Sequence, residues 1–465
     1  MTSILSFLFV LGVLIFVHEL GHFMMARRIG VRVLTFSLGF GPKILSFRRG
    51  DTEYCVSAIP LGGYVKMAGE TPEDARTGSS DEFLSKTKWQ RFQVLVMGPV
   101  MNLVLAVIVM AIVLLQGAKL PAFDDYPVVI GGFAPGSPAQ AAGLQEGDRI
   151  VSVDDRDISS WKQFYMTTAT RANRPVRIVI ERDGKRTERQ VMPVAVDRFE
   201  TAAVGLLPVT HPQIDTLHKG QPGDEAGLRK GDFILGVGGQ PLRVSPEDLA
   251  QLSRGSPDAV FAVLVAERAR ARLIESIQAS EGRPLSLDVQ RGNERLAVTV
   301  TPRLSEGTVR IGAMITPLEL KVVEPGPLEA VKLSLDQNWE WTTQIFETLG
   351  GLFTRQTSVK QLMGPVAIAG LSGEAAQQAS WIPLFTLMAM ISLNLGLLNL
   401  MPIPVLDGGH IAILALEGVS RRDFSMKVKE KMLLAGFVLL LMLMVTVIYN
   451  DLMRIQWIER FIPWR

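Results

Sequence analysis

The sequence predicts a membrane protein with four transmembrane helices and, between the second and third of them, a charged section of two similar α+β domains. Three observations predict this class. The 465-residue chain is 48% hydrophobic and only 20% charged, which disfavours an ordinary soluble enzyme. The charged section contains an internal repeat. Four stretches without Lys, Arg, Asp or Glu approach the roughly 20 residues that a helix needs to cross a bilayer: residues 1–18, 92–118, 375–406 and 432–450.

The composition also excludes two kinds of site. The 48 Lys+Arg are balanced by 46 Asp+Glu, so no basic surface argues for a nucleic-acid partner. Cys55 is the only cysteine. The chain therefore cannot form an internal disulfide or a cysteine-rich metal site.

The first apolar stretch predicts a retained transmembrane helix over residues 1–25. It lacks the basic start and the small-residue cleavage site of a signal peptide, and it continues into His18 and Glu19. Residues 26–93 carry eleven Lys or Arg, whereas none precedes the first span. Because basic loops stay in the cytoplasm, we expect the N-terminus outside and residues 26–93 on the cytoplasmic side.

The remaining segments follow from this topology. The second transmembrane helix returns the chain to the outside, and the third and fourth helices are separated by a basic cytoplasmic loop. The predicted ranges are 94–118 for the second helix, 381–407 for the third, 408–431 for the loop and 432–450 for the fourth.

The extracytoplasmic section contains the repeat, with a pitch of 84 residues. The segment from Ala142 to Val153 aligns without gaps with the segment from Ala226 to Val237. In each, Ala-Gly-Leu ends a short helix and Gly-Asp leads into an apolar strand. The two domains, residues 128–196 and 207–303, resemble PDZ domains. That resemblance implies substrate selection or gating by strand addition, and a pair of spacer domains is the alternative.

A helical pattern follows within residues 322–374. Apolar side chains recur at helical spacing from residue 328 to residue 353, and Trp339 and Trp341 suit a membrane interface. We expect an amphipathic helix lying on the outer leaflet. A helix that packs against the outer domains is the alternative.

The first span carries the pattern H-E-x-x-H at His18-Glu19-Leu20-Gly21-His22. On a helix, His18 and His22 project from one face and can share a metal ion, while Glu19 can take a proton from a water on that metal. The bare pattern recurs by chance. Inside a transmembrane helix, however, ionisable side chains are costly and mark functional sites, so the sequence predicts a metal centre.

A catalytic zinc needs a third protein ligand and an open position. Asp407 and His410 both lie near the end of the third span, where Pro402 and Pro404 break the helix. Such breaks occur at membrane depth when they are buried or line a water-filled cavity. The topology places the first-span motif and Asp407 toward the same cytoplasmic leaflet, as a shared ion requires.

The H-E-x-x-H motif, the segment N-x-x-P-x-P-x-L-D-G from Asn399 to Gly408 and the PDZ-like pair together resemble the bacterial site-2 protease family of intramembrane zinc metalloproteases. The resemblance implies a four-helix metalloprotease core with one zinc ion held by His18, His22 and Asp407. It implies that Glu19 is the general base. Asn399 would help to hold the substrate backbone, with Asn394 as a weaker candidate, and His410 stays a rival ligand on spacing alone.

Residues 34–67 contain apolar, β-prone runs interrupted by glycine and proline, which predict β-hairpins. The family resemblance implies a re-entrant β-loop here. Its edge, at Gly62, Gly63 and Tyr64, could hold an unwound substrate as an added strand. A small structural sheet is the alternative.

The resemblance further implies a multi-pass protein of the bacterial cytoplasmic (inner) membrane. Its partners would be the lipid bilayer and single-pass substrates that a first protease has shortened, such as an anti-sigma factor in an envelope stress response, with signal-peptide remnants as a further class. Two other functions are a membrane metal-ion transporter and a noncatalytic PDZ scaffold. The first lacks a relay of ionisable groups across the bilayer, and the second leaves the intramembrane His, Glu and Asp unexplained.

Overall fold

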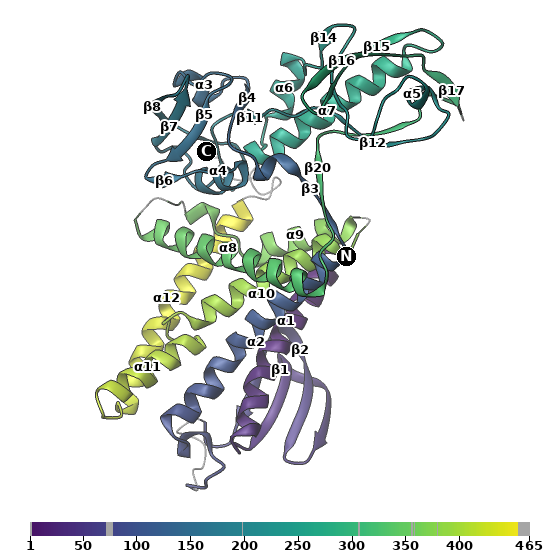
Figure 1. The fold of residues 1–465 in the computed structure, drawn as a ribbon. Helices are drawn as coiled ribbons and strands as arrows, with labels where there is room; N and C mark the ends of the chain where they lie inside the picture. The colour runs from purple at the N-terminus through teal and green to yellow at the C-terminus, as the bar shows by residue number, and fades with distance from the viewer. Residues whose placement is uncertain are drawn as a thin grey trace. The chain divides into compact units, whose positions relative to one another are not determined.

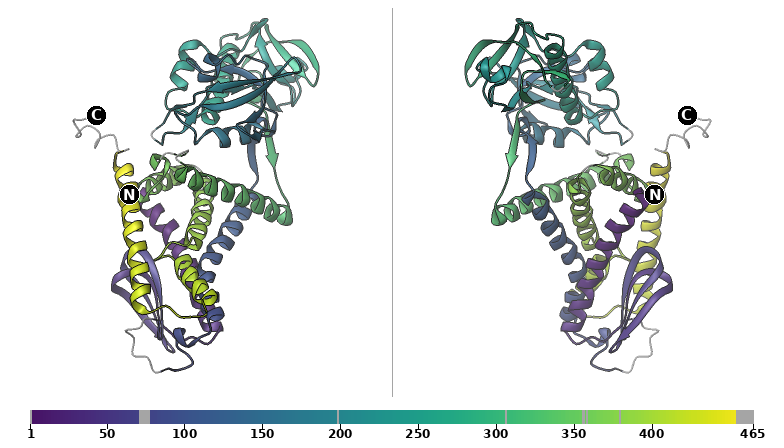
Figure 2. Two further views of the ribbon diagram at one scale, coloured as in Figure 1. Left: turned by 90° about the vertical axis from the view of Figure 1, so that its left-hand side faces the viewer. Right: turned by 90° about the vertical axis from the view of Figure 1, so that its right-hand side faces the viewer.

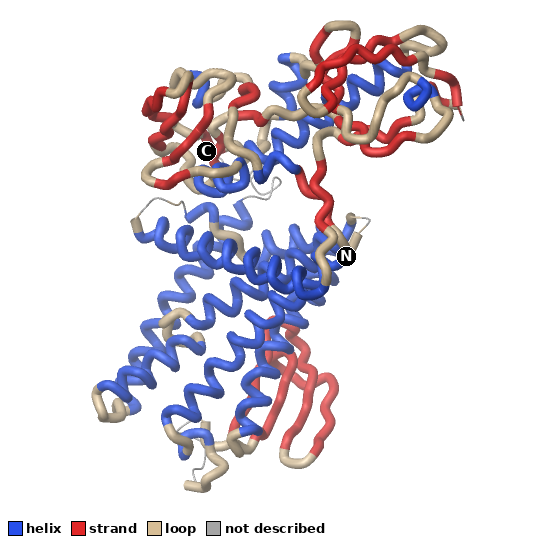
Figure 3. Tube along the Cα trace, in the orientation of Figure 1, coloured by secondary structure: helices blue, strands red, loops and turns tan. Residues whose placement is uncertain are grey.

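The computed structural model describes residues 2–70, 78–197, 199–305, 307–354, 357, 359–378 and 380–453 (Figure 1). The chain divides into two compact units. The helical unit comprises Met1–Gly117, Glu324–Leu349 and Leu362–Arg465, and the β-rich unit comprises Ala118–Val323 and Gly350–Gln361. Figure 3 shows this contrast in secondary structure.

Four helices within the described residues are long and apolar enough to cross a membrane. The second of them starts at Lys88 rather than at the predicted residue 94, because Thr87 and Gln90 form a capping box, and it ends at Leu115 rather than at residue 118. The four helices are α1 (Thr2–Arg28), α2 (Lys88–Leu115), α10 (Ile382–Leu400) and α12 (Met426–Met453).

Helices α1, α2 and α10 pack around a small apolar core. Leu14 of α1 and Ala389 of α10 are fully buried there, beside Val109 of α2. In contrast, α12 exposes a run of large apolar side chains, including Leu434, Phe437 and Met442. Such a helix surface is stable in contact with lipid and unfavourable in water.

The third span is shorter than predicted. Helix α10 ends at Leu400, and Asp407 is the first residue of a separate helix, α11 (Asp407–Val419). The predictions of a span reaching residue 407 and of a loop over 408–431 are therefore wrong. Prolines at two positions after Leu400 remove backbone donors and stop the helix. The chain then restarts as α11 instead of remaining irregular.

A tight turn leads into α11. The N–H of Leu406 donates to the carbonyl of Ile403, and Val405, the third residue of the turn, has φ +87°. Positive φ at this position normally requires glycine, so a β-branched residue here is strained. A Cβ on Gly408 would overlap the carbonyl oxygen of Met401. Only glycine therefore lets the first turn of α11 pack on this segment.

Two further helices complete the helical unit. Residues predicted as an amphipathic helix form α8 (Pro327–Phe353), which lies crosswise to the spanning helices in Figures 1 and 2. Ser334 of α8 donates to the carbonyl of Val107 in α2. Helix α9 (Pro365–Gln377) was not predicted. Its first backbone N–H groups donate to the buried carboxylate of Asp451 in α12.

A β-hairpin follows α1, with η1 (Phe83–Ser85) after it. Strands β1 (Val33–Arg49) and β2 (Thr52–Met67) are long and bent, and Ser37 of β1 is paired with both Cys55 and Tyr64 of β2. The first half of β1 thus lies between the two halves of β2. Among the described strands, the last residues of β2 form one edge of this small sheet.

The β-rich unit contains two lobes, which we name the first lobe (residues 128–208) and the second lobe (residues 213–316). In the first lobe, the sheet order is β6-β5-β7-β8, with a separate β11-β4 pair. The elements of the first lobe are β4 (Ile130–Phe133), α3 (Pro138–Ala141), β5 (Arg149–Val153), β6 (Arg156–Asp157), α4 (Trp161–Thr168), β7 (Val176–Arg182), β8 (Lys185–Val191), β9 (Val194–Ala195), β10 (Ala202–Ala203) and β11 (Leu206–Pro208).

In the second lobe, the main sheet has the order β16-β15-β13-β12-β19, so β19 lies at its end. Outside both lobes, β3 (Ala118–Pro121) pairs with β20 (Leu320–Val323), η2 (Ala122–Asp125) follows β3, and η3 (Val359–Gln361) lies near the end of the unit. The elements of the second lobe are β12 (Gln213–Leu217), α5 (Pro222–Glu225), β13 (Phe233–Val237), β14 (Gln240–Pro241), α6 (Pro246–Leu252), α7 (Asp258–Gln278), β15 (Leu285–Arg291), β16 (Glu294–Val300), β17 (Arg303–Ser305), β18 (Thr308–Arg310) and β19 (Ala313–Thr316).

Both lobes extend beyond the predicted ranges 128–196 and 207–303. Strand β11 pairs with β4 and closes the first lobe at Pro208, and β19 pairs with β12 and closes the second at Thr316. In each lobe the last strand returns to the first. Such a contact joins residues far apart in the sequence, which local periodicity does not reveal.

The repeat also reproduces a buried ion pair. In the first lobe, Arg182 donates to the Asp148 carboxylate and to the carbonyl of Gly143. In the second, Arg291 donates to Asp232 and to the carbonyl of Gly227. Both carboxylates are 1% exposed. An arginine at the equivalent position therefore connects the Gly-Asp turn to a distant strand in each lobe.

We expect Asp148→Asn to destabilise the first lobe by about 2 to 3 kcal/mol, because Arg182 loses a charged partner. Burial alone would raise the pKa of Asp148, but Arg182 and the N–H of Gln145 lower it below its ordinary value. A carboxyl whose pKa is lowered by folding stabilises the fold above about pH 4, and that stability is lost as the pH falls through the folded-state pKa. In Asp148→Asn, the free energy of unfolding of the first lobe should therefore change less as the pH falls. Hydrogen exchange of the β7 backbone amides is measured in the full-length protein at increasing urea concentration, at pH 7 and at pH 4. It reports both the loss of stability and its dependence on pH.

The matched control is Asp155→Asn, at a side chain that is 92% exposed. It should leave the exchange of β7 unchanged at both pH values. Equal losses in the two variants would contradict the role of the buried pair.

Candidate metal centre

Three side chains of the helical unit converge on one point. The Nε2 atoms of His18 and His22 lie 3.2 Å apart, and Oδ2 of Asp407 lies 3.1 Å from the first and 3.5 Å from the second. A tetrahedral ion with bonds of 2.0–2.1 Å places its ligand atoms about 3.3 Å apart. The three atoms are therefore spaced to share one zinc-sized ion. Among the described residues, no other group of His, Cys, Asp or Glu meets this criterion.

Helix α2 orients the ring of His22. The Nδ1–H of His22 donates to the carbonyl of Val94 at 2.8 Å, and this side chain is only 8% exposed. A donor at Nδ1 leaves the lone pair on Nε2, as metal binding requires. A Cβ on Gly98 would overlap the same imidazole. Glycine at this position thus lets α2 pack directly against the ring.

Asn102 of α2 orients the ring of His18 in a similar way. The side-chain amide lies 3.3 Å from Nδ1 of His18, and Asn102 is fully buried. Its Oδ1 has no hydrogen-bond partner. If Nε2 of His18 binds a metal, Nδ1 carries a proton and needs an acceptor. With the amide turned by 180°, Oδ1 faces Nδ1 and accepts that proton. The buried amide can therefore support a metal on Nε2 of His18.

Sequence reasoning did not identify Asn102. A polar side chain inside an uncharged span was the available signal, because an amide in a transmembrane helix usually has a partner on a neighbouring helix. The backbone carbonyl of Asn102 also accepts a hydrogen bond from Ser392 of α10. The amide that contacts His18 is therefore tied to a second spanning helix.

Glu19 lies beside the centre and against the hairpin. Its carboxylate interacts electrostatically with both histidines and with Asp407, and the backbone of Val65 hydrogen-bonds to it. A Cβ on Gly63 would lie 3.0 Å from Cγ of Glu19. The edge of β2 thus runs directly along the predicted general base.

The other predicted hairpin residues continue this edge. The Phe40 ring stacks on the Tyr64 ring at 6.1 Å, and a Cβ on Gly62, which has φ +144°, would overlap Phe40. The predicted residues Gly62, Gly63 and Tyr64 therefore belong to one strand beside Glu19.

The predicted polar residues of α10 and α11 differ in position. Asn399 shares a helix face with Ser392 and Gly396, which pack on α2, whereas Asn394 projects about 140° away from Asn399 at 100° per residue. Neither amide has a hydrogen-bond partner among the described residues. His410 is exposed on α11 and lies outside the three-residue group. The geometry thus favours Asp407 over His410 as the third ligand.

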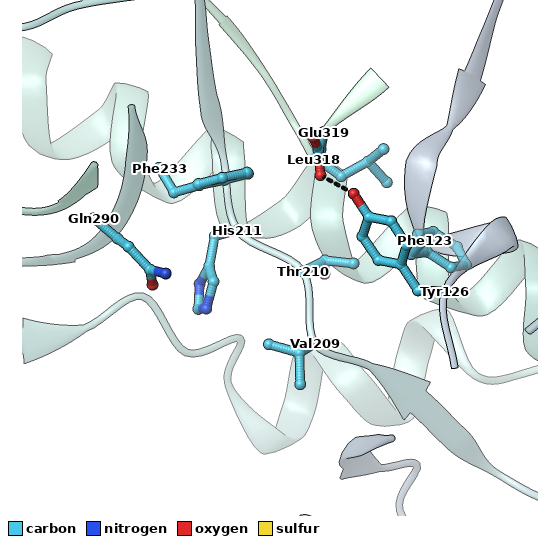
Figure 4. Close-up of a pocket in the computed structure, with 9 residues that line it drawn as sticks. All are labelled: Phe123, Tyr126, Val209, Thr210, His211, Phe233, Gln290, Leu318 and Glu319. Carbon is cyan, nitrogen blue, oxygen red and sulfur yellow. Dashed lines mark hydrogen bonds between the residues drawn. The ribbon is translucent and has the colours of Figure 1, made fainter. Parts of the chain in front are cut away.

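The remaining two histidines lie in the β-rich unit. His211 lines a cavity of about 190 Å³ (Figure 4), where the Tyr126 hydroxyl donates to Glu319 at 2.6 Å. Burial lowers the pKa of His211, with a smaller contribution from Arg295. His218 lines a different cavity in the second lobe. Within the described part of the chain, neither histidine belongs to a candidate metal group.

A family model for peptidase family M50 matches residues 6–443. The chain belongs to peptidase family M50. Protease RseP of Yersinia pestis is 32% identical over 481 residues, covering 97% of this chain and 99% of that protein. The regulator of sigma-E protease RseP of Escherichia coli is 31% identical over 474 residues, covering 97% and 98%. A Xylella fastidiosa protein with the provisional name of zinc metalloprotease is 32% identical over 461 residues, covering 95% and 96%.

Among solved structures, a PDZ domain of an SdrC-like protein from Listeria monocytogenes matches 18% of this chain and 85% of that domain, with 22% identity and a TM-score of 0.16. Family membership confirms the expected site-2 protease type and the expected enzyme class, a zinc metallopeptidase. It favours the enzyme over the transporter and the scaffold.

We expect Asn102→Leu to weaken zinc binding to this M50 peptidase by about 10- to 100-fold, because His18 loses the acceptor that sets its tautomer. Chelator competition on the purified full-length protein measures the dissociation constant. Ser392→Ala is the matched control, because it removes a hydrogen bond to the same residue but leaves the amide in place. Equal affinities in all three proteins would refute the role of Asn102.

Proposed function

We propose that this M50 peptidase hydrolyses peptide bonds within the transmembrane segments of single-pass proteins. The observation that carries the proposal is the convergence of His18 and His22, on the membrane-length helix α1, with Asp407 at the start of α11, next to Glu19. These three side chains can bind one zinc ion, so Glu19 is not needed as a ligand. Zinc held there supplies Lewis-acid activation of water and of the scissile carbonyl.

The residues of the chain supply the proton transfers. Glu19 takes the proton of the attacking water and delivers it to the nitrogen of the leaving amine. His18 and His22 keep their Nε2 lone pairs toward the ion because Asn102 and the carbonyl of Val94 hold the Nδ1 protons. Asn399, on the face of α10 that packs on α2, is a candidate to hold the substrate backbone.

The hairpin edge supports a way to present the substrate. A transmembrane helix shields its peptide bonds with i to i−4 hydrogen bonds, so it must unwind before cleavage, and another partner must replace those bonds. The strand that contains Gly62, Gly63 and Tyr64 offers an edge beside Glu19. In this proposal the hairpin is the re-entrant β-loop, and the unwound segment adds to it as a strand.

The two lobes of the β-rich unit are proposed as PDZ-like substrate selectors. Support comes from the second lobe, where a cavity of about 610 Å³ lies between the end strand β19 and α7 and is lined by Ile274 and Ile277. A sheet edge beside an apolar helix is the arrangement that accepts an added peptide strand.

Topology and substrates complete the proposal. In this proposal the hairpin and the metal centre lie toward the cytoplasmic leaflet of a bacterial inner membrane, with the lobes outside. The basic residues within 26–93 and 408–431 support this orientation. The proposed α8 position is the outer interface. Substrates are single-pass proteins that another protease has shortened, with an anti-sigma factor and signal-peptide remnants as the first classes to examine.

Cleavage of a model transmembrane peptide tests the mechanism. Glu19→Gln should keep one zinc per chain and lower the cleavage rate at least 10³-fold, because the base is lost but no ligand is removed. Asp407→Asn should lose both zinc and cleavage. Metal analysis and the cleavage assay are carried out on the same purified samples in detergent.

His410→Gln serves as the control for Asp407→Asn, since it changes a side chain of the same helix outside the metal group. It should retain zinc and activity. Full activity in Glu19→Gln would overturn the assignment of the base, and full zinc content in Asp407→Asn would overturn the ligand set.

The hairpin edge has its own test. Gly62→Ala should lower the cleavage of a helical transmembrane peptide at least tenfold with zinc content unchanged, because the added Cβ displaces Phe40 and bends the edge. Gly50→Asn is the control. Gly50 lies in the same hairpin in open space with φ +63°, a conformation that asparagine tolerates. Equal activity in both variants would remove the hairpin edge from the mechanism.

A further inference from the structure

The two lobes of the β-rich unit share a loop at the start of their last strand. In each, a glycine with positive φ follows an apolar residue, and both carbonyls of the pair accept backbone N–H groups from the first half of the lobe. The equivalent pairs are Val204-Gly205, with φ +76° at the glycine, and Ile311-Gly312, with φ +71°. The carbonyl groups are thus used inside each lobe, and the two N–H groups of each pair remain for another acceptor.

In the first lobe, a carboxylate from the second lobe fills this position. Asp258, the first residue of α7, accepts the N–H of Val204 at 2.8 Å and the N–H of Gly205 at 3.1 Å. Asp258 is 5% exposed, and no basic side chain among the described residues pairs with it. Two successive backbone donors on a buried carboxylate form a nest of the kind that captures a peptide carboxyl terminus.

The rest of the first half of α7 follows Asp258 into the first lobe. Phe261 is 1% exposed and belongs to the same apolar core as Trp161, Phe164 and Leu206. Helix α4 bounds the other side, because Trp161 and Phe164 belong to that core and Tyr165 packs against it. The segment therefore lies between β11 and α4, where an added peptide strand would lie.

The second lobe shows the same loop without an occupant. Among the described residues, nothing accepts the N–H groups of Ile311 and Gly312, and both residues line the cavity of about 610 Å³ beside β19. Ile274 and Ile277 of α7 line the same cavity. The two lobes thus differ in one respect: the loop of the first is filled, and the loop of the second is open.

We propose that the first turn of α7 is an internal ligand of the first lobe, with the Asp258 carboxylate in the place of a peptide carboxyl terminus. The inference rests on the proposed role of the lobes as peptide-binding domains. The first groove is closed to peptides, and the second is the one that accepts them. Because α7 is one helix of 21 residues, its first half seals one groove while its second half lines the other.

Hydrogen exchange at two backbone amides gives the direct test. In the full-length Glu19→Gln protein, Asp258→Ala should raise the exchange of the Val204 and Gly205 amides at least tenfold. Asp248→Ala, on α6 and paired with Arg268, should not change them. Unchanged exchange at both amides in Asp258→Ala would overturn the proposal. If strand β7 also loses protection, the first lobe has unfolded, and the same comparison is read from Asp258→Asn, which keeps the side-chain shape.

Peptide binding gives the second test. The probe is a fluorescein-labelled decapeptide with an apolar last residue and a free carboxyl group, compared with its C-terminal amide. Ile274→Glu places a negative charge in the second groove and should abolish binding of the free acid. Adding Asp258→Ala to Ile274→Glu should restore binding, and the free acid should bind at least tenfold more tightly than the amide. The bound peptide should again protect the Val204 and Gly205 amides from hydrogen exchange.

The two failures are distinguishable. Peptide binding by the second groove must depend on the peptide carboxyl group and must be lost in Ile274→Glu. If the Glu19→Gln protein with both lobes intact shows no such binding, the proposed role of the lobes fails. If that binding is present but Asp258→Ala restores nothing in the Ile274→Glu protein, the internal ligand alone is refuted.

Discussion

The meeting of Asp407 with two imidazoles inside an apolar bundle is the constraint on which the rest of the helical unit depends. A carboxylate among transmembrane helices is unfavourable unless charge or hydrogen bonds compensate it, so its position must be held closely. The segment after α10 does this. Two prolines end the helix, a turn with strained Val405 reverses the chain, and Gly408 lets α11 begin against that turn. The backbone strain thus lies next to Asp407, the candidate third ligand, as strain at functional sites usually does.

The neighbouring helix α2 carries no ligand, yet it orients both histidines. Gly98 brings its backbone against the ring of His22, so that the Val94 carbonyl reaches Nδ1, and Asn102 reaches Nδ1 of His18 one turn further along. The geometry of the candidate ligands is thus set by packing of α1 on α2 rather than by the motif alone. A short pattern on one helix would leave the two rings free to rotate, and the metal affinity would fall accordingly.

Much of the candidate site was predictable, because its residues lie in short sequence motifs. His18, Glu19 and His22 are neighbours on one helix, and Asp407 stands beside prolines in an uncharged region. The missed features depend on contacts between distant residues. Asn102 is recognisable only when α2 is placed against α1. The last strands β11 and β19 belong to lobes whose first strands lie far earlier in the chain. The start of α11 at Asp407 is the exception, because it depends on the local turn at Ile403 to Leu406, where Val405 has a φ that a β-branched residue rarely adopts. Periodicity reports which face of an element is apolar, but not which element covers it.

The cap on α9 links α1 to α12, two helices that lie far apart in the sequence. Asp451, near the end of α12, accepts the N–H groups of Gly364, Val366 and Ala367, and α9 in turn packs on α1, where a Cβ on Gly373 would overlap the Ser3 side chain. Without the Asp451 carboxylate, the first N–H groups of α9 would lose their acceptors. A side chain outside the three-residue group thus stabilises the helix that packs on α1, the helix that carries both histidines.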